Sequence, residues 1–350
     1  MPQGNHTLLL TTEGSLLSFG NNSDGQLGLG HKHNQTEAMV VPWGGARPFQ
    51  VDWGLRHSLV LDEAGVVWEA GQSISLTFQQ VPELPSITVV AAGYTHSAAL
   101  DTNNAGWVWR NHATCYPWAS TLPKRVEDLP PVLKVACGMG FLVVETEEAL
   151  WVLGCNTNGQ LGLDHMDPVP QFTRVEIEGR PEGPLRSLTA FSYGILIVDS
   201  KGSAWSTGDN SHGQLGRNGN RTVFGKIEGL PPLKAAASGG SHNLALDTKG
   251  GVWVWGRGQD GQLGTNTSGK STPTHVPLLN GTIHLMAALH HSLAFHPNGG
   301  LYLFGWNLHG QLGLLHTTDQ GTPTLSPYHP APPAQPRNRQ KSARSAIEYQ

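Results

Sequence analysis

Cysteine, charge and long apolar runs are all scarce in this sequence. Charged residues make up 14% of the 350 residues, and the three cysteines, Cys115, Cys137 and Cys155, form no Cys-x-x-Cys pair. An odd and sparse cysteine count argues against a disulfide framework and a structural zinc site, and it favours a reducing compartment. The N-terminus lacks the basic and apolar regions of a signal peptide, and no run is long enough to span a bilayer. We expect an intracellular protein, cytoplasmic or nuclear, that does not cross a membrane.

Motifs of catalysis and cofactor binding are missing as well. The sequence contains no P-loop, no Gly-x-Ser-x-Gly turn, no His-Glu-x-x-His helix and no dinucleotide fingerprint after a strand. We therefore expect no cofactor, no metal, no small-molecule substrate and no classical catalytic residue.

Glycine and proline are abundant instead. The chain has 44 Gly and 24 Pro, a proportion that is too high for a helical protein and is typical of short strands joined by many turns. The 11 Trp residues supply large apolar anchors for a core. The composition predicts an all-β protein.

One tetrapeptide, Gly-Gln-Leu-Gly, recurs five times. Its last three intervals are 54, 48 and 49 residues, and the first, 134 residues, is close to three periods, so two degenerate copies must lie inside it. We predict structural roles: glycines for positive φ angles or close backbone approach, leucine for the core, and glutamine for backbone groups that the loop leaves unpaired. The copies are Gly25-Gln26-Leu27-Gly28, Gly159-Gln160-Leu161-Gly162, Gly213-Gln214-Leu215-Gly216, Gly261-Gln262-Leu263-Gly264 and Gly310-Gln311-Leu312-Gly313.

A histidine followed by an apolar strand is the second landmark. In four copies a glycine follows fourteen residues later, whereas the third copy has Arg110 at that place. Seven repeats result, starting near residues 3, 53, 92, 137, 190, 238 and 287. The position is occupied in chain order by His6, His57, His96, Phe141, Gly194, His242 and His291. Because this position supplies at most one histidine per repeat, the rings do not converge. We therefore predict that each ties its repeat to the next one through a ring nitrogen and holds no metal.

The sixth repeat shows the content of one unit. Its pattern predicts strands at 243–246 and 252–255 joined by a turn, a loop at 256–264, and short strands around 273–277 and 283–287. Four short strands in about 50 residues is typical of a propeller blade. We predict an all-β, seven-bladed β-propeller over residues 1–326, followed by a Pro-rich and then basic tail at 327–350.

The tetrapeptide, the Gly-x-x-His strand and the period of about 50 residues together resemble the regulator-of-chromosome-condensation (RCC1-like) repeat family. The resemblance covers about residues 3–327. WD40 repeats are shorter and carry Gly-His and Trp-Asp marks that are absent here, and kelch repeats lack Gly-Gln-Leu-Gly. The second and third repeats are eroded after Gly71 and Trp109, and neither end supplies an evident fourth strand. Whether the ring closes is therefore left open.

The resemblance implies a protein–protein interaction scaffold. The alternative that it implies is a guanine-nucleotide exchange factor for a small Ran-like GTPase, acting through loops on one propeller face. Long singular segments often mark the binding face of a repeat array. We therefore name the segment 168–184 as the candidate partner-binding surface, with Glu178, Arg180 and Glu182 as its residues; the alternative is a solvated loop.

Two other functions of this fold are not expected. Four basic residues lie between Arg337 and Arg344, so the propeller itself is more acidic than the net charge of −4 and nucleic-acid binding is disfavoured. The basic stretch is either a nuclear-import signal or a solvated tail. The Gly-Trp-Arg-His-Thr signature of the plant ultraviolet receptor of this fold is absent. The tryptophans at 68, 151, 205 and 253 fall at strand positions, so we expect them in the core.

Overall fold

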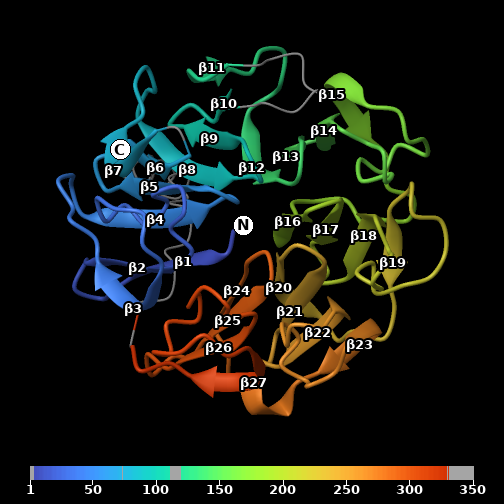
Figure 1. The fold of residues 1–350 in the computed structure, drawn as a ribbon. Helices are drawn as coiled ribbons and strands as arrows, with labels where there is room; N and C mark the ends of the chain where they lie inside the picture. The colour runs from blue at the N-terminus through green and yellow to red at the C-terminus, as the bar shows by residue number, and fades with distance from the viewer. Residues whose placement is uncertain (1–3, 73, 111–119, 329, 331–350) are drawn as a thin grey trace, which may run out of the picture.

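The computed structural model describes residues 4–72, 74–110, 120–328 and 330. Within these residues the chain forms 27 strands and one 3-10 helix, and the strands make seven antiparallel sheets arranged in a ring (Figure 1). This is the seven-bladed propeller that the repeat predicts. The predicted tail lies outside the described residues except for its first few positions.

Each sheet is a meander whose strands pair in sequence order. Blade 1 contains β1 (His6–Leu10), β2 (Leu16–Gly20) and β3 (Gln35–Val40). Blade 2 contains β4 (Pro48–Trp53), β5 (His57–Asp62), β6 (Val67–Gly71) and β7 (Ser75–Gln80). Blade 3 contains β8 (Ile87–Ala92), β9 (Ser97–Asp101), β10 (Gly106–Trp109) and β11 (Lys124–Arg125). Blade 4 contains β12 (Val132–Cys137), β13 (Phe141–Thr146), β14 (Leu150–Gly154) and β15 (Val169–Val175).

The remaining blades follow the same order. Blade 5 contains β16 (Ser187–Phe191), β17 (Gly194–Val198), β18 (Ala204–Gly208) and β19 (Gly225–Ile227). Blade 6 contains β20 (Leu233–Ser238), β21 (His242–Asp247), β22 (Val252–Arg257) and β23 (Gly269–His275), and η1 (Pro277–Leu279) follows it. Blade 7 contains β24 (His284–Ala287), β25 (His291–Phe295), β26 (Leu301–Gly305) and β27 (Gln320–Leu325). The four strands expected in the sixth repeat are thus present.

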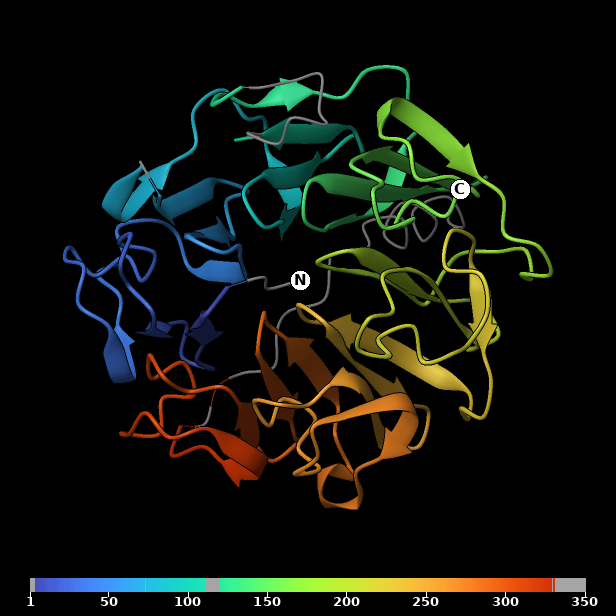
Figure 2. The same ribbon diagram turned by 45° about the vertical axis from the view of Figure 1, so that its right-hand side comes forward.

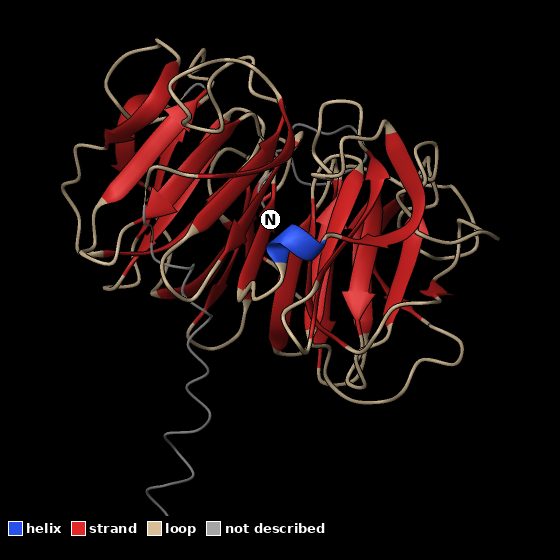
Figure 3. Cartoon of the chain, turned by 90° about the horizontal axis from the view of Figure 1, so that it is seen from below, coloured by secondary structure: helices blue, strands red, loops and turns tan. Residues whose placement is uncertain are grey.

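The ring has two faces, because successive antiparallel strands turn at opposite ends (Figure 3). In blades 2–7 the first strand of each blade lies nearest the ring centre and the last lies at the rim (Figure 1). We call the loop face the side that carries the connections from first to second strand and from third to last strand, including all Gly-Gln-Leu-Gly loops. We call the turn face the side that carries the second-to-third turns and the links between blades.

The core lies between blades, not inside one sheet. The second strands of blades 2, 4, 5 and 6 are buried along their whole length, because a neighbouring blade covers each of their faces. Strands buried on both faces are expected to read as nearly continuous apolar runs, as Gly194–Val198 does. One core cluster joins Leu8, Trp53 and Phe295, which come from blades 1, 2 and 7.

Among the described residues blade 1 has three strands, and β1 corresponds to the second strand of the other blades. The chain beyond β27 reaches this blade, where Pro330 forms an antiparallel bridge with Thr11. The neighbours of blade 1 in the ring are blades 2 and 7 (Figures 1 and 2). The Leu315 N–H donates to the Thr36 carbonyl at 2.9 Å, and the Tyr328 ring stacks on Phe19 with centroids 6.3 Å apart. Blades 7 and 1 are thus joined by lateral contacts and by the chain beyond β27, where the Tyr328 hydroxyl accepts the Ala38 N–H at 2.9 Å.

Erosion in blades 2 and 3 takes different forms. In blade 2 the long loop is missing, and residues 75–80, which follow Gly71 almost directly, form the outer strand β7. In blade 3, Arg110 replaces the landmark glycine but keeps its left-handed backbone at φ 60°. Its guanidinium makes two bonds, of 2.8 and 2.7 Å, to the buried carboxylate of Glu69 in blade 2. A charge-assisted, bidentate pair thus compensates for a strained position.

Two expectations about side chains need correction. Of the four tryptophans placed in the core, Trp205 is buried but the others are only partly so. Their indole N–H groups bind turn residues, as Trp68 does with Asp62 at 2.9 Å, which holds each ring at the turn face. The fully buried tryptophans are Trp53, Trp109 and Trp255. The second correction concerns disulfides: Cys155 is disulfide-bonded, while Cys137 is a free, buried thiol.

Candidate functional site

The Gly-Gln-Leu-Gly loops organise the loop face from within. In all five copies the glutamine Oε1 accepts the backbone N–H of the residue two positions earlier, at 2.8–3.0 Å. All five leucines are fully buried, and the first and last glycine of every copy has positive φ. The predicted roles of glutamine, leucine and glycine in this loop are confirmed.

The same loops hold successive blades together. Gly310 packs against the backbone of Thr36, and Gly159 against that of Thr222, so that a Cβ at either glycine would overlap the next blade. The loop then donates to that blade's rim: Gly30 N–H to the Leu76 carbonyl at 2.8 Å and Asp164 N–H to the Thr222 carbonyl at 2.9 Å. The repeated residues are therefore committed to blade-to-blade contacts.

The histidines make a second blade-to-blade connection. His242 Nε2 lies 2.9 Å from Ser292 Oγ, and that hydroxyl donates to the Gln262 carbonyl at 2.8 Å. Because the hydroxyl proton points to the carbonyl, the imidazole must donate through Nε2–H. Nδ1 of the neutral ring then carries no proton. The relays equivalent to this one are His6–Ser58–Gln26 and His291–Thr7–Gln311, and His57 also bonds Ser97.

Burial keeps these histidines neutral. It lowers the pKa of His57, His242 and His291 from 6.5 to about 3, and it lowers that of His96 to about 4. A neutral imidazole donating from Nε2 is the form that the relay requires. The predicted structural role, a ring nitrogen tying one blade to the next, is confirmed where a relay exists.

A chain of backbone hydrogen bonds runs around the ring axis on the loop face. The first-to-second-strand connections of neighbouring blades bond to one another, and we call this set the collar. It includes Leu55 N–H to the Tyr94 carbonyl at 3.0 Å and Leu289 N–H to the Gly4 carbonyl at 3.3 Å. The remaining members are Tyr94 to Gly138, Met139 to Ser192, Ser192 to Gly240 and Gly240 to Leu289. The collar thus passes from blade 2 through blades 3–7 to blade 1.

Unrepeated side chains stand on this repeated backbone. The residue after each landmark glycine, which we call the post-glycine residue, donates its N–H to the first-to-second-strand connection of its own blade, as Trp306 does to the His290 carbonyl at 2.9 Å. Its side chain differs among the six blades in which it follows a landmark glycine. The described post-glycine residues are Asn21, Gln72, Cys155, Asp209, Arg257 and Trp306.

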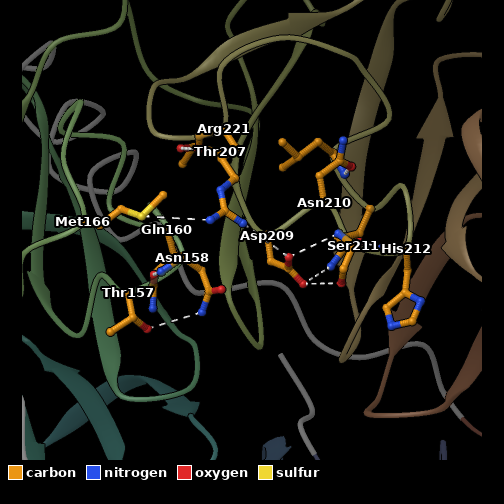
Figure 4. A network of polar contacts seen from close by, with 12 residues as sticks. Thr157, Asn158, Gln160, Met166, Thr207, Asp209, Asn210, Ser211, His212 and Arg221 are labelled. Carbon is orange, nitrogen blue, oxygen red and sulfur yellow. Dashed lines mark hydrogen bonds and ion pairs between the residues drawn. The ribbon is translucent and has the colours of Figure 1, made fainter.

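Acidic and basic side chains alternate on the loop face. Arg257 lies 3.2 Å from Asp260, and His290 Nδ1 lies 3.7 Å from the same carboxylate. Figure 4 shows the loops of blades 4 and 5, where Asp209 accepts bonds from Ser211 and faces Arg221, which lies 3.9 Å away. A surface of mixed charge suits a protein partner better than a polyanion.

The residues predicted for partner binding lie on the turn face. Residues 169–175 are the outer strand β15, so only 176–186 form a loop, which is longer than the other links between described strands of consecutive blades. Glu178 and Glu182 are exposed, and Arg180 donates to the Gly183 carbonyl at 3.3 Å. The structure therefore corrects the prediction of 168–184 as one long singular segment, since its first part is a regular strand.

A pocket of about 280 Å³ lies beside this loop. It is lined by Glu147 and Glu148 of a blade 4 turn, together with Arg180 and Glu182. Glu145 at its base is buried and satisfied, since it lies 2.6 Å from the Lys134 ammonium and accepts the Leu185 N–H at 2.6 Å. Its carboxylate anchors the end of the loop to blade 4.

The described ranges contain neither a cluster of metal-ligating side chains nor a membrane-spanning helix. No group of three or more His, Cys, Asp or Glu side chains there could hold a metal ion. No helix in this part of the chain is long and apolar enough to cross a membrane.

Comparison with known sequences identifies the repeat. The profile described as "Regulator of chromosome condensation (RCC1) repeat" matches residues 201–246 and 249–295, and a second profile of that description matches residues 4–26 and 234–262. The chain belongs to the RCC1-like repeat family. Its propeller resembles the crystal structure of Prp20p from Saccharomyces cerevisiae, with a TM-score of 0.77 and 20% identity over 91% of this chain and 87% of that one. The work on Prp20p describes its binding to Gsp1p and histones.

Two curated relatives extend the comparison. The secretion-regulating guanine nucleotide exchange factor of Mus musculus is 31% identical over 68% of this RCC1-like chain and 62% of its own length. The mitochondrial RCC1 domain-containing protein RUG3 of Arabidopsis thaliana is 29% identical over 67% of this chain and 60% of its own length. The match therefore spans about 60% of each relative.

Sequence reasoning missed the post-glycine residues as a site. The signal was present, because aligning the repeats on the landmark glycine shows a position that varies directly beside one that does not. Long singular segments often mark a binding face, whereas these are single side chains on a constant backbone.

Proposed function

We propose that this RCC1-like propeller is a protein-binding platform and that the partner contacts its loop face. The observation that carries the proposal is the division of labour on that face. The repeated residues make the hydrogen bonds of the loops, the relays and the collar, while the described post-glycine side chains vary from blade to blade. A rigid frame with variable side chains is the arrangement expected of a recognition surface.

The test is recovery of a partner that depends on this face. Affinity purification with mass spectrometry on the intact chain should identify proteins that are lost when Arg56 and Trp306, from blades 2 and 7, are both replaced by alanine. Arg56 has 56% of its side chain exposed, so its loss should not unfold the protein. If both forms capture the same proteins equally well, the loop face is not the binding surface.

Guanine-nucleotide exchange on a small GTPase is the second candidate. It is favoured by the mouse relative, whose name is that of an exchange factor, and it requires no acid–base side chain in the propeller. Such activity would be measured as release of fluorescent GDP from purified GTPases, Ran included. Acceleration that disappears in the same double variant would support exchange through the loop face.

The turn-face loop supplies a rival surface. Shortening residues 176–184 to a tight turn should leave stability nearly unchanged, because closure entropy varies weakly with loop length and Leu185, which bonds Glu145, is retained. If that variant abolishes capture while the loop-face variant does not, the contacts come from Glu178, Arg180 and Glu182. Normal capture by the shortened form would exclude them.

A further inference from the structure

One buried glutamine amide in blade 7 lacks an acceptor. Gln311 is fully buried and its Oε1 accepts the His309 N–H, yet its Nε2 has no hydrogen-bond partner. A buried unsatisfied donor is costly, and native structures contain few of them. This amide is therefore a place to look for an external acceptor.

Sister blades show where that acceptor would sit. In blade 1 the equivalent Gln26 Nε2 donates to Asn21 Oδ1 at 3.2 Å, and in blade 5 Gln214 Nε2 donates to Asp209 Oδ2 at 2.7 Å. Asn21 and Asp209 are post-glycine residues. In blade 7 that position is Trp306, whose indole has no acceptor. Because Oε1 is held in the same way in all three blades, the free Nε2 of Gln311 points toward the Trp306 side of the loop.

Blade 4 also has an unpaired glutamine amide, but the residues around it differ from those in blade 7. Gln160 Nε2 also has no partner, but its post-glycine residue, Cys155, is disulfide-bonded. In blade 7 the Trp306 ring is only partly buried, and Leu308, two residues on, is 58% exposed. Blade 4 also exposes an apolar side chain, Met166, but its sulfur accepts a bond from Arg221 at 3.9 Å. Blade 7 differs in combining its unpaired amide with a partly exposed tryptophan and an exposed leucine.

The surroundings of Trp306 favour an acidic ligand group. His290 and His309 meet the indole edge-to-face, with ring centroids 5.6 and 5.1 Å away. Beyond His290, Asp260 is shared with Arg257, whose Nε is buried and has no partner. The nearest carboxylate is thus already paired, and two donors on adjacent loops remain unused.

The geometry points to a docking site for a protein partner that presents an Asp or Glu carboxylate beside an apolar side chain. The carboxylate takes the place that Asp209 fills in blade 5 and accepts the Gln311 amide, while the apolar group packs on Trp306 and Leu308. Tryptophan is strongly enriched at the centre of protein interfaces. This inference rests on the proposed function and assigns its centre to blade 7.

The amide itself is the most direct readout. In ¹⁵N NMR spectra, titration with N-acetyl-glutamate should shift the Gln311 side-chain NH₂ and the Trp306 indole, more than N-acetyl-glutamine does. The Gln214 amide, already bonded to Asp209, is the matched control and should not move. No shift at Gln311 with either compound, or equal shifts at Gln214, would overturn the assignment.

Trp306→Asn is the matching variant. It places in blade 7 the residue that satisfies Gln26 in blade 1, so the protein should stay folded while its amide is closed to ligands. The NMR shifts should vanish, and affinity for a partner captured by the wild type should fall about tenfold or more. Leu308→Ala should also weaken binding, whereas Leu278→Ala, equally exposed on the turn face, should not.

The outcomes separate the two proposals. Undiminished partner affinity in Trp306→Asn would refute the blade 7 site while leaving the platform function standing. A ligand-induced shift at Gln311 with no partner captured by any form would support the site and count against the platform function.

Discussion

Gln262 makes contacts in three directions, which explains why its residue type recurs. Its Oε1 accepts the Asp260 N–H, its Nε2 donates to the Asp260 carboxylate, and its backbone carbonyl accepts the Ser292 hydroxyl of the next blade. A side-chain amide has an oxygen that accepts and a nitrogen that donates, so it can make both bonds at one buried place. A glutamate would lose the donor, and a leucine would lose both bonds.

Leu263 beneath this glutamine should be costly to truncate. Leu263→Ala is expected to lower the free energy of unfolding by about 2–5 kcal/mol, the range for truncating a buried leucine, because the residue has no exposed surface. Urea denaturation measures the change. Leu278→Ala, with 57% of the residue exposed, is the control and should be nearly neutral. If Leu263→Ala costs as little as this control, the loop has collapsed and filled the cavity.

Arg110→Gly should destabilise the protein although it restores the landmark glycine. Glycine removes about 1–2 kcal/mol of left-handed strain, but it leaves the Glu69 carboxylate, 7% exposed, without its cation. Removing one partner of a buried pair typically costs about 3–5 kcal/mol. We expect a lower urea midpoint.

The double variant Arg110→Gly with Glu69→Gln checks this reasoning. Without the buried charge the glycine should be tolerated, so the second substitution should recover most of the lost stability. A single variant as stable as the wild type would show that the pair contributes nothing. The sequence indicated that Arg110 was unusual but not why, since its partner lies 41 residues away in another blade.

At the scale of the element, the relay explains the placing of the histidines. Each lies at or directly before the start of its strand, and in most blades a glycine two or three residues earlier makes room for the ring, as Gly239 does for His242. His291 has Ala288 at that place. In blades 4 and 5 the rings of Phe141 and Phe191 take this space, against Gly138 and Gly194. The sequence predicted Phe141 but not Phe191, because Phe191 reaches the place from a different strand.

Acid should weaken the blade contacts that depend on neutral histidine. The pKa of His57, His242 and His291 is about 3 in the folded protein and about 6.5 when unfolded. Above pH 6.5 both states are neutral and stability is constant. Below it only the unfolded state takes up protons, so stability falls by about 1.4 kcal/mol per pH unit for each histidine, down to about pH 3.

Urea midpoints from pH 8 to pH 4 measure this slope. A His242→Gln variant should be less stable at pH 7 and should show a shallower decline, because one titrating group is gone. A flat profile in the wild type would mean that the relay opens and lets water reach the imidazoles.

The sequence pattern predicts the strands of the structure correctly where the repeats are regular, and it fails where a segment is irregular. Periodicity gave the sixth blade correctly, since each strand alternates or is fully apolar. It failed at 168–184, because β15 is an outer strand with exposed side chains and two prolines flank Val169, which together resemble a loop. The post-glycine residues were missed because their significance comes from the ring, where blades distant in sequence meet.

At the scale of the molecule, the seam between blades 7 and 1 repeats the contacts of the other interfaces. The collar crosses the seam through Leu289 and Gly4, and the relay crosses it through His291 and Thr7. The hydrogen bond from the loop to the rim of the next blade is made by Leu315 and Thr36. Elsewhere a short link also joins consecutive blades through the chain. At the seam the described part of the chain reaches blade 1 only through Tyr328 and the single bridge of Pro330 to Thr11, so the effective concentration of one blade for the next is lower.

Thr7→Val should therefore open the ring locally. The substitution keeps the side-chain shape but removes the hydroxyl that lies 2.8 Å from His291 Nε2 and donates to the Gln311 carbonyl at 2.7 Å. Leaving two buried polar groups unpaired costs about 1–3 kcal/mol each. Hydrogen exchange should show the amides of β1 and Leu289 losing protection before those of blades 3–5.

Ser292→Ala is the matched control, because it removes the same hydroxyl from the relay between blades 6 and 7. It should cost a similar free energy of unfolding, but without early exchange at its interface, since the link at 276–283 still holds these two blades together. Early exchange confined to the seam in Thr7→Val would identify that interface as the one where the ring opens. The same exchange pattern in both variants would mean that the seam is as firmly closed as any other interface of this ring.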